Sequence, residues 1–183
     1  MKLILARRIT PALLMLTVGL APIALGAQQA RRPDVIWVPT SDGTVEAMLK
    51  LAGVGPDDIV YDLGCGDGKI VIAAAKLGAR AVGIDIDPGR VRDAKMNVRL
   101  SGVEDKVLII QGDIFDPNLS FSEATVVTLF LLEQLNIRLM PRLQTELKPG
   151  TRVVSNTFTM GSEWPYDKTE QAGFNQIYLW LIR

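Results

Sequence analysis

The sequence has no histidine and only one cysteine among its 183 residues. Without histidine, the chain cannot use a histidine general base, a histidine-containing triad or a histidine metal ligand, and we expect no metal site. The single Cys65 excludes an internal disulfide and paired-cysteine redox chemistry. Neither sign of charge is in excess, because 20 Lys and Arg side chains balance 20 Asp and Glu side chains. The overall charge therefore gives no reason to expect nucleic-acid binding.

Long apolar runs are also scarce, and the main one lies near the start of the chain. Three basic side chains among the first eight residues precede an uncharged apolar run at 11–25, and small residues at 25–27 are followed by glutamines. This order predicts a secretory signal peptide over residues 1–27 and a periplasmic protein. The run is short for a membrane span of roughly 20 residues. An uncleaved inner-membrane anchor over 9–27 remains the alternative, and only in that case do we expect membrane contact.

The remainder of the chain has the composition of one folded domain. The sequence is 48% apolar and 22% charged, and it shows no internal repeats. Its length allows a sizeable hydrophobic core. We expect residues 28–33 to be a flexible lead-in and residues 34–183 to form a single domain.

Residues 59–76 carry the most informative pattern. A β-branched and aromatic run at 59–61 predicts a strand, an alanine-rich apolar run at 70–76 predicts a helix, and glycines occupy positions 64, 66 and 68 between them. Such a turn can bind a nucleotide, because glycine lets a ligand approach the backbone and the helix N-terminus favours negative charge. A dinucleotide loop would need glycine where this chain has Lys69. Taken alone, the pattern also fits a simple tight turn, in which Cys65 is a small packing residue.

Two further acidic positions follow predicted strands. Asp85 lies near the end of a strand predicted over 81–87, 21 residues beyond Gly64, the spacing of an acid that accepts hydrogen bonds from ribose hydroxyls. The alternative is a helix cap before Pro88, a role that Asp87 suits better. Asp113 follows a strand predicted over 107–111, where it either binds an adenine or stabilises a turn.

The glycine loop reads D-x-G-x-G-x-G and resembles motif I of the class I S-adenosylmethionine-dependent methyltransferases, while the two later acids resemble motifs II and III. The resemblance implies an α/β Rossmann-like sandwich, with a mostly parallel sheet and helices on both faces, and S-adenosylmethionine as the cofactor. Asp62 would lie near the methionine amino group, the helix N-terminus would receive the methionine carboxylate, and Asp113 would accept from the adenine amino group. The cofactor-binding residues implied are Asp62, Gly64, Cys65, Gly66, Gly68, Asp85, Ile86, Asp113 and Ile114.

A closer similarity is to the small lysine methyltransferases of the ATP synthase c-subunit type and their bacterial homologues. It rests on V-P-T near residue 38 and on Y-D-L-G-C-G-D-G-K-I-V-I-A-A-A-K. It implies a protein amine, such as lysine, as the acceptor. The N/D-P-P-Y/F motif of many amino-methylating relatives is absent after the strand predicted over 124–131, so methylation of adenine, cytosine or glutamine amide loses support.

No catalytic residue is assigned from the sequence. Glu133 is the only ionisable group near the end of the fourth strand, and a solvated residue at a helix start explains it better than catalysis. Trp37, Phe130 and Trp164 could wall an amine site, although we expect at least one of them to pack in the core. A small-molecule methyltransferase and a non-catalytic cofactor-binding envelope protein remain alternatives.

The two ends of the domain are less clearly patterned. Ser41 or Asp42 can cap a helix that ends near Gly53, and this helix either only packs on the sheet or also closes over the cofactor. Towards the C-terminus we expect a helix over 136–147, a strand over 151–158, loop over 161–173 and a last strand over 177–182. This part is shorter than the family pattern requires.

Overall fold

The computed structural model describes residues 39–183, which form four helices and seven strands. The predicted signal peptide or anchor, the lead-in at 28–33, the start of the domain at 34 and Trp37 all lie outside the described residues. No helix in the described part is long and apolar enough to cross a membrane.

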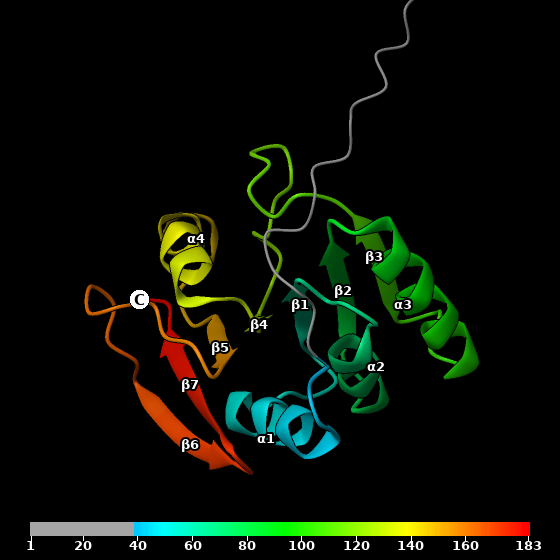
Figure 1. Ribbon diagram of the computed structural model, residues 1–183, viewed down its shortest axis with the longest axis horizontal. Coiled ribbons are helices and arrows are strands. Elements are labelled where there is room, and N and C mark those ends of the chain that lie inside the picture. Colours follow the sequence, from blue (N-terminus) through cyan, green and yellow to red (C-terminus); the bar gives the residue numbers. More distant parts are fainter. Residues whose placement is uncertain (1–38) are drawn as a thin grey trace, which may run out of the picture.

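All seven strands belong to one sheet, in the order β3-β2-β1-β4-β5-β7-β6 (Figure 1). The first five are parallel, and β7 runs antiparallel to both β5 and β6. The strands are β1 Ile59–Leu63, β2 Arg80–Asp85, β3 Val107–Gln111, β4 Val126–Leu129, β5 Arg152–Asn156, β6 Lys168–Ala172 and β7 Asn175–Leu181. The helices are α1 Asp42–Ala52, α2 Lys69–Lys76, α3 Pro88–Leu100 and α4 Glu133–Glu146. The predicted α/β sandwich with a mostly parallel sheet is confirmed.

The sheet separates two hydrophobic cores, because successive side chains of a strand point to opposite faces. Val60 joins the core formed with α1, α2 and α3, whereas the adjacent Tyr61 joins the core formed with α4. Figure 1 shows α4 on one side of the sheet and α1 and α2 on the other. Both faces of the central strands are therefore covered, which explains why β1 and β4 are buried along almost their whole length.

Local capping signals set the helix boundaries as the sequence predicts. The Ser41 hydroxyl accepts a hydrogen bond from the Thr44 amide at 3.2 Å, and α1 ends at Gly53, which has a φ of 63°. The Asp87 carboxylate accepts from the Gly89 amide at 2.6 Å and caps α3, with Pro88 in the first turn. Asp87 is thus the cap, and Asp85 is left for another role.

The region expected to be loop at 161–173 contains a strand, so that prediction is wrong. Strand β6 lies at the sheet edge and is exposed at four of its five residues, so it lacks the apolar alternation by which a strand is recognised. What the C-terminal end lacks is a helix between β5 and β6. The connection at 157–167 is anchored instead by Trp164, whose carbonyl accepts a hydrogen bond from the Trp180 indole at 2.8 Å.

Candidate functional site

A cavity of about 800 Å³ opens at the carboxyl ends of the parallel strands. It lies where β1 has β2 on one side and β4 on the other, the switch point at which open α/β sheets bind ligands. Its size is in the range of small-molecule and cofactor sites. Seven of the nine predicted cofactor-binding residues line it, namely Asp62, Gly64, Cys65, Asp85, Ile86, Asp113 and Ile114.

The glycine turn holds the backbone close to the cavity. Gly64 has a φ of 92°, and a Cβ atom at this position would lie 3.0 Å from Leu131 Cδ2 in the cavity wall. Gly66 and Gly68 do not line the cavity. The Gly66 amide donates to Asp85, and a Cβ on Gly68 would lie 3.2 Å from that of Ala94 in α3. These two glycines therefore shape the turn and the helix packing.

Asp62 is a buried acid at the floor of the cavity. It is 3% exposed, and its Oδ1 accepts a hydrogen bond from the Thr128 hydroxyl at 2.8 Å. Burial raises the pKa of this carboxyl to about 7; the Thr128 hydrogen bond lowers it, and the nearby Asp85 and Asp67 raise it. A carboxylate in this position is stabilised by a cationic ligand, because an opposite charge favours the ionised form.

Asp85 both supports the glycine turn and faces the cavity. Its Oδ2 accepts from the Gly66 amide at 2.8 Å, and its Oδ1 accepts from the Asp87 amide at 2.9 Å. Burial raises the pKa of Asp85, while these two backbone hydrogen bonds lower it. Each carboxylate oxygen has two lone pairs, so Asp85 can still accept from two hydroxyl groups of a ligand.

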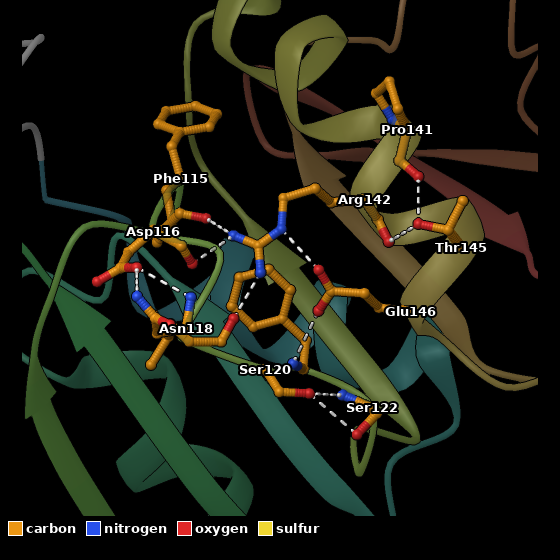
Figure 2. A network of polar contacts seen from close by, with 12 residues as sticks. Phe115, Asp116, Asn118, Ser120, Ser122, Pro141, Arg142, Thr145 and Glu146 are labelled. Carbon is orange, nitrogen blue, oxygen red and sulfur yellow. Dashed lines mark hydrogen bonds and ion pairs between the residues drawn. The ribbon is translucent and has the colours of Figure 1, made fainter.

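The loop after β3 carries Asp113 and Ile114 to the cavity, and α4 holds this loop in place. Figure 2 shows the Arg142 guanidinium reaching into the loop. It donates to the carbonyls of Ile114 at 2.6 Å, Asp116 at 3.1 Å and Leu119. Glu146 pairs with the same guanidinium at 2.6 Å, one helical turn further on. Sequence reasoning missed this role, because an arginine on a helix surface gives no sign of which loop it contacts.

Two aromatic rings of the loop also contact arginines of α4. The Arg142 guanidinium carbon lies 4.5 Å from the centre of the Phe121 ring. The Arg138 guanidinium carbon lies 3.7 Å from the centre of the Phe115 ring, which lines the cavity. Such contacts are attractive, because the ring face is electrostatically negative. Helix α4 thus supports one wall of the cavity through Arg138 and Arg142, and it also lines the cavity with Leu135.

Cys65 is a packing residue, as expected. The thiol is buried, and burial raises its pKa well above the usual value, so it is a poor nucleophile at neutral pH. Its sulfur would lie only 2.9 Å from a Cβ atom on Gly83 in β2. Among residues 39–183 no cluster of three or more acidic, cysteine or histidine side chains is placed to hold a metal ion.

The start of α1 belongs to the cavity wall as well as to the core. Thr40, Ser41 and Thr44 line the cavity. The Lys69 ammonium donates to the Thr40 carbonyl at 3.0 Å and pairs with Asp42 at 2.9 Å, which ties this segment to the glycine turn. The apolar side of α1 packs in the core, as the packing role predicts, and its N-terminal end borders the cavity. Closure of this helix over the cofactor stays a prediction.

The far end of the cavity is aromatic. Phe130, Phe158 and Phe174 line it, from the ends of β4 and β5 and from the β6–β7 hairpin. Phe130 was among the expected wall residues. Trp164 was too, but it is buried against Trp180, with ring centres 6.0 Å apart, and does not line the cavity. Glu133 is exposed in the first turn of α4 and is not in the cavity wall, as expected for a solvated residue at a helix start.

Comparisons with known proteins agree with this geometry. A family model described as the ANTKMT methyltransferase domain matches residues 62–168, more than half of the chain. The chain is 46% identical over 155 residues to a protein-lysine N-methyltransferase of Saccharolobus islandicus (strain REY15A), an alignment covering 82% of this chain and 95% of that protein. It is 32% identical over 152 residues to the ATP synthase C-subunit lysine N-methyltransferase of Xenopus laevis, covering 83% and 66% respectively.

A solved structure shares the fold. It is described as an RNA methyltransferase from Salinibacter ruber in complex with S-adenosyl-L-homocysteine. The match has a TM-score of 0.76 and 49% sequence identity, and it covers 79% of this chain and 94% of that one. The chain is therefore an S-adenosylmethionine-dependent methyltransferase with a Rossmann-like fold. Within that class it belongs to the ANTKMT methyltransferase family.

The cavity fits this cofactor on two observations. Asp62 is a buried carboxylate that faces the cavity, where an ammonium group can stabilise it. Gly64 leaves space at the wall that a Cβ atom would fill. These two features suit a ligand that carries a positive charge and lies close to the backbone of the glycine turn.

Proposed function

We propose that this methyltransferase acts on the side-chain amino groups of protein lysines. The observation that carries the proposal is the distribution of charge in the cavity. Five carboxylates line it, against two cationic side chains, Lys69 and Arg90. Both cations are paired with acids outside the cavity wall, Lys69 with Asp42 at 2.9 Å and Arg90 with Asp93 at 3.3 Å. The cavity therefore offers little attraction to a phosphate-bearing acceptor, which is in keeping with an amine acceptor.

The two kinds of relative differ in their described acceptors. The Saccharolobus and Xenopus proteins are lysine methyltransferases, whereas the Salinibacter protein is described as an RNA methyltransferase. Binding to RNA draws on Lys and Arg contacts with phosphates. The formal net charge of the present chain is zero. Lysine is thus the better supported acceptor, and RNA is the alternative that the experiment must address.

The predicted cofactor contacts are part of the proposal. Asp62 would bind the methionine ammonium, and the amides of the turn beginning at Gly64 and of the α2 N-terminus would bind the methionine carboxylate. Asp85 would accept from the ribose hydroxyls, as the spacing predicts. Asp113 would accept from the adenine amino group, with Ile86 and Ile114 beside the base.

The residues of this chain act mainly by positioning and by excluding water. When bound, S-adenosylmethionine would supply a methyl group on its sulfonium sulfur. The cavity residues would hold the neutral acceptor amine in line with the S–C bond that breaks, and the proton of the methylated ammonium would pass to water. An ammonium that enters an apolar pocket has a lowered pKa, so the neutral amine becomes more populated without a dedicated base. Holding donor and acceptor in line supplies much of the rate enhancement.

Methyl transfer from labelled cofactor is the direct test. The protein is incubated with labelled S-adenosylmethionine and, separately, with a total protein extract and a total RNA extract. We expect label on lysine after digestion of the protein fraction and none on RNA. Asp85→Ala serves as a control with impaired cofactor binding and should abolish most of the label. Label on RNA alone would exclude the lysine proposal.

We also propose that residues 1–27 direct export, that residues 28–33 are a lead-in and that the catalytic domain spans 34–183. The basic start, the apolar run and the small residues before the glutamines support export. Intact-mass measurement on the protein isolated from its native envelope tests this. A mass lacking residues 1–26 or 1–27 is expected for a periplasmic enzyme. A mass that includes them would indicate the inner-membrane anchor instead.

A further inference from the structure

We infer that the acceptor amine enters through an aromatic mouth formed by Phe130, Phe158 and Phe174, and that the tip of the β6–β7 hairpin selects it. The inference rests on the proposed function. It assigns a role in acceptor binding to the part of the cavity that the predicted cofactor-binding residues do not line. The predicted cofactor residues belong to the carboxyl ends of β1, β2 and β3. The aromatic mouth belongs to β4, β5 and the hairpin.

The first wall of the mouth is a pair of stacked rings. Phe130 follows β4 and Phe158 follows β5, and these strands are hydrogen-bonded neighbours. The two ring centres are 6.3 Å apart, and the ring planes are inclined by 27°. This arrangement presents a flat apolar surface at the point where parallel strands end and ligands bind.

The loop that carries Phe158 is held in a strained conformation. Thr157 has a φ of 68° and is the one residue other than glycine with positive φ in the described chain. The Asn136 side-chain amide, from α4, donates to the carbonyls of Phe158 at 3.2 Å and Thr159 at 3.3 Å. Residues held in such regions are strained and cluster at ligand-binding sites. The geometry of this wall is therefore imposed by the surrounding structure.

A buried asparagine couples the wall to the hairpin. The Asn156 Oδ1 atom accepts from the Asn175 side chain at 2.8 Å and from the Thr157 hydroxyl at 3.0 Å. Asn156 is fully buried, and its Nδ2 has no hydrogen-bond partner among the described residues. Because Asn175 is adjacent to Phe174 in the chain, these contacts tie the hairpin tip to the end of β5, from which Phe158 follows.

Phe174 forms the second wall. Its side chain lines the cavity yet is fully exposed, at 105% of the reference area. The tip can place it there because Gly173, with a φ of 64°, makes the tight turn between β6 and β7. An aromatic ring left in solvent at the opening of a cavity gains most from a ligand that covers it.

A lysine side chain matches this mouth. Its apolar stem can lie on the rings while its ammonium contacts their negative faces. No charged side chain of the described chain lines this end, whose other wall residues are Leu131, Leu132, Leu135, Thr157, Ala172, Gly173 and Asn175. A phosphate group would therefore find no cation here, whereas an amine would be desolvated, as methyl transfer requires.

Phe174→Ala tests the inference, with poly-L-lysine as the acceptor probe and labelled S-adenosylmethionine as the donor. We expect the KM for poly-L-lysine to rise about tenfold, the effect of losing one partly desolvated cation–ring contact. The affinity for S-adenosylhomocysteine, measured by calorimetry, should stay unchanged. Phe174→Tyr should restore the KM. Leu108→Ala is the matched control, because Leu108 is 58% exposed on β3 at the other end of the sheet and does not line the cavity.

The outcomes separate this inference from the proposed function. If the wild-type protein methylates poly-L-lysine and Phe174→Ala does so with the same KM, the aromatic mouth is refuted while lysine methylation stands. A matching loss of S-adenosylhomocysteine affinity in Phe174→Ala would place the residue in cofactor binding and would also overturn it. If the wild-type protein labels neither poly-L-lysine nor lysines of a total protein extract, the proposed function itself fails.

Discussion

Replacing Asp62 by asparagine should make the protein more stable and at the same time impair cofactor binding. Asparagine has the shape of aspartate and can keep a hydrogen bond with Thr128, but it carries no charge. Burial raises the pKa of Asp62 in the folded protein to about 7, from an ordinary value of 3.8. The substitution therefore removes the cost of a buried carboxylate.

The sign of the pH dependence follows from proton binding. Between the unfolded pKa near 4 and the folded pKa near 7, the folded protein retains a proton that the unfolded chain releases, so wild-type stability falls as pH rises and levels off above about 7. Each pKa unit corresponds to about 1.4 kcal/mol, so the full effect at pH 8 is about 4 kcal/mol. Between pH 5 and pH 8 the advantage of Asp62→Asn over wild type should grow by about 3 kcal/mol.

Thermal unfolding of both proteins at pH 5, 6, 7 and 8 measures this difference. For a domain of this size, about 3 kcal/mol corresponds to a Tm gap that widens by about 6–12 °C. Asp105→Asn is the control, because Asp105 is exposed before β3 and its variant should follow the wild-type curve. Calorimetry with S-adenosylhomocysteine should show affinity reduced about 10- to 100-fold in Asp62→Asn, the loss of one charge-assisted hydrogen bond. A Tm gap that does not change with pH, or unchanged affinity, would refute the reasoning.

Three further predictions concern the cavity and the strand packed behind it. Asp85→Ala should weaken S-adenosylhomocysteine binding by about 1–3 kcal/mol, because the carboxylate contacts are lost, and equal affinities in calorimetry would contradict this. Arg142→Met should free the loop after β3, because the three hydrogen bonds from Arg142 to loop carbonyls are lost. We expect faster hydrogen exchange at 113–119 and weaker cofactor binding. Arg142→Lys should restore the slow exchange and the cofactor affinity only in part. Gly83→Ala should destabilise the fold by about 1–3 kcal/mol in denaturant unfolding, because its Cβ would lie 2.9 Å from the Cys65 sulfur.

Local features of the fold were predictable because each depends on residues close together in sequence. The cap at Ser41, the cap at Asp87 with Pro88 after it, and the glycine turn are all short-range patterns, and the structure shows each in place. The mostly parallel sheet was implied by the resemblance to the class I methyltransferases, and the structure shows strands that alternate with helices as such a sheet requires. The loop expected at 161–173 failed for the same reason, since β6 is an exposed edge strand whose pairing with β7 leaves no periodic signal.

The site was predictable on the side where its residues follow motif spacing. Asp62, Asp85 and Asp113 lie at the ends of three neighbouring parallel strands, so their convergence on one cavity follows from the topology. The aromatic side was only partly foreseen. Phe130 and Trp164 were both candidate wall residues, and the sequence does not distinguish them. In the structure Phe130 lines the cavity, whereas Trp164 packs on the core residue Trp180.

The class of the protein can be recognised from its amino-acid sequence alone, through a glycine turn and acids at set distances along the chain. Only the packed structure shows what cannot be read from spacing: that Arg142 of α4 holds a loop more than twenty residues earlier, and that Phe174 lines the same cavity as Phe130. Contacts of this kind depend on how helices and hairpins pack around the sheet. Many distant residues set that packing together, and no local pattern encodes it.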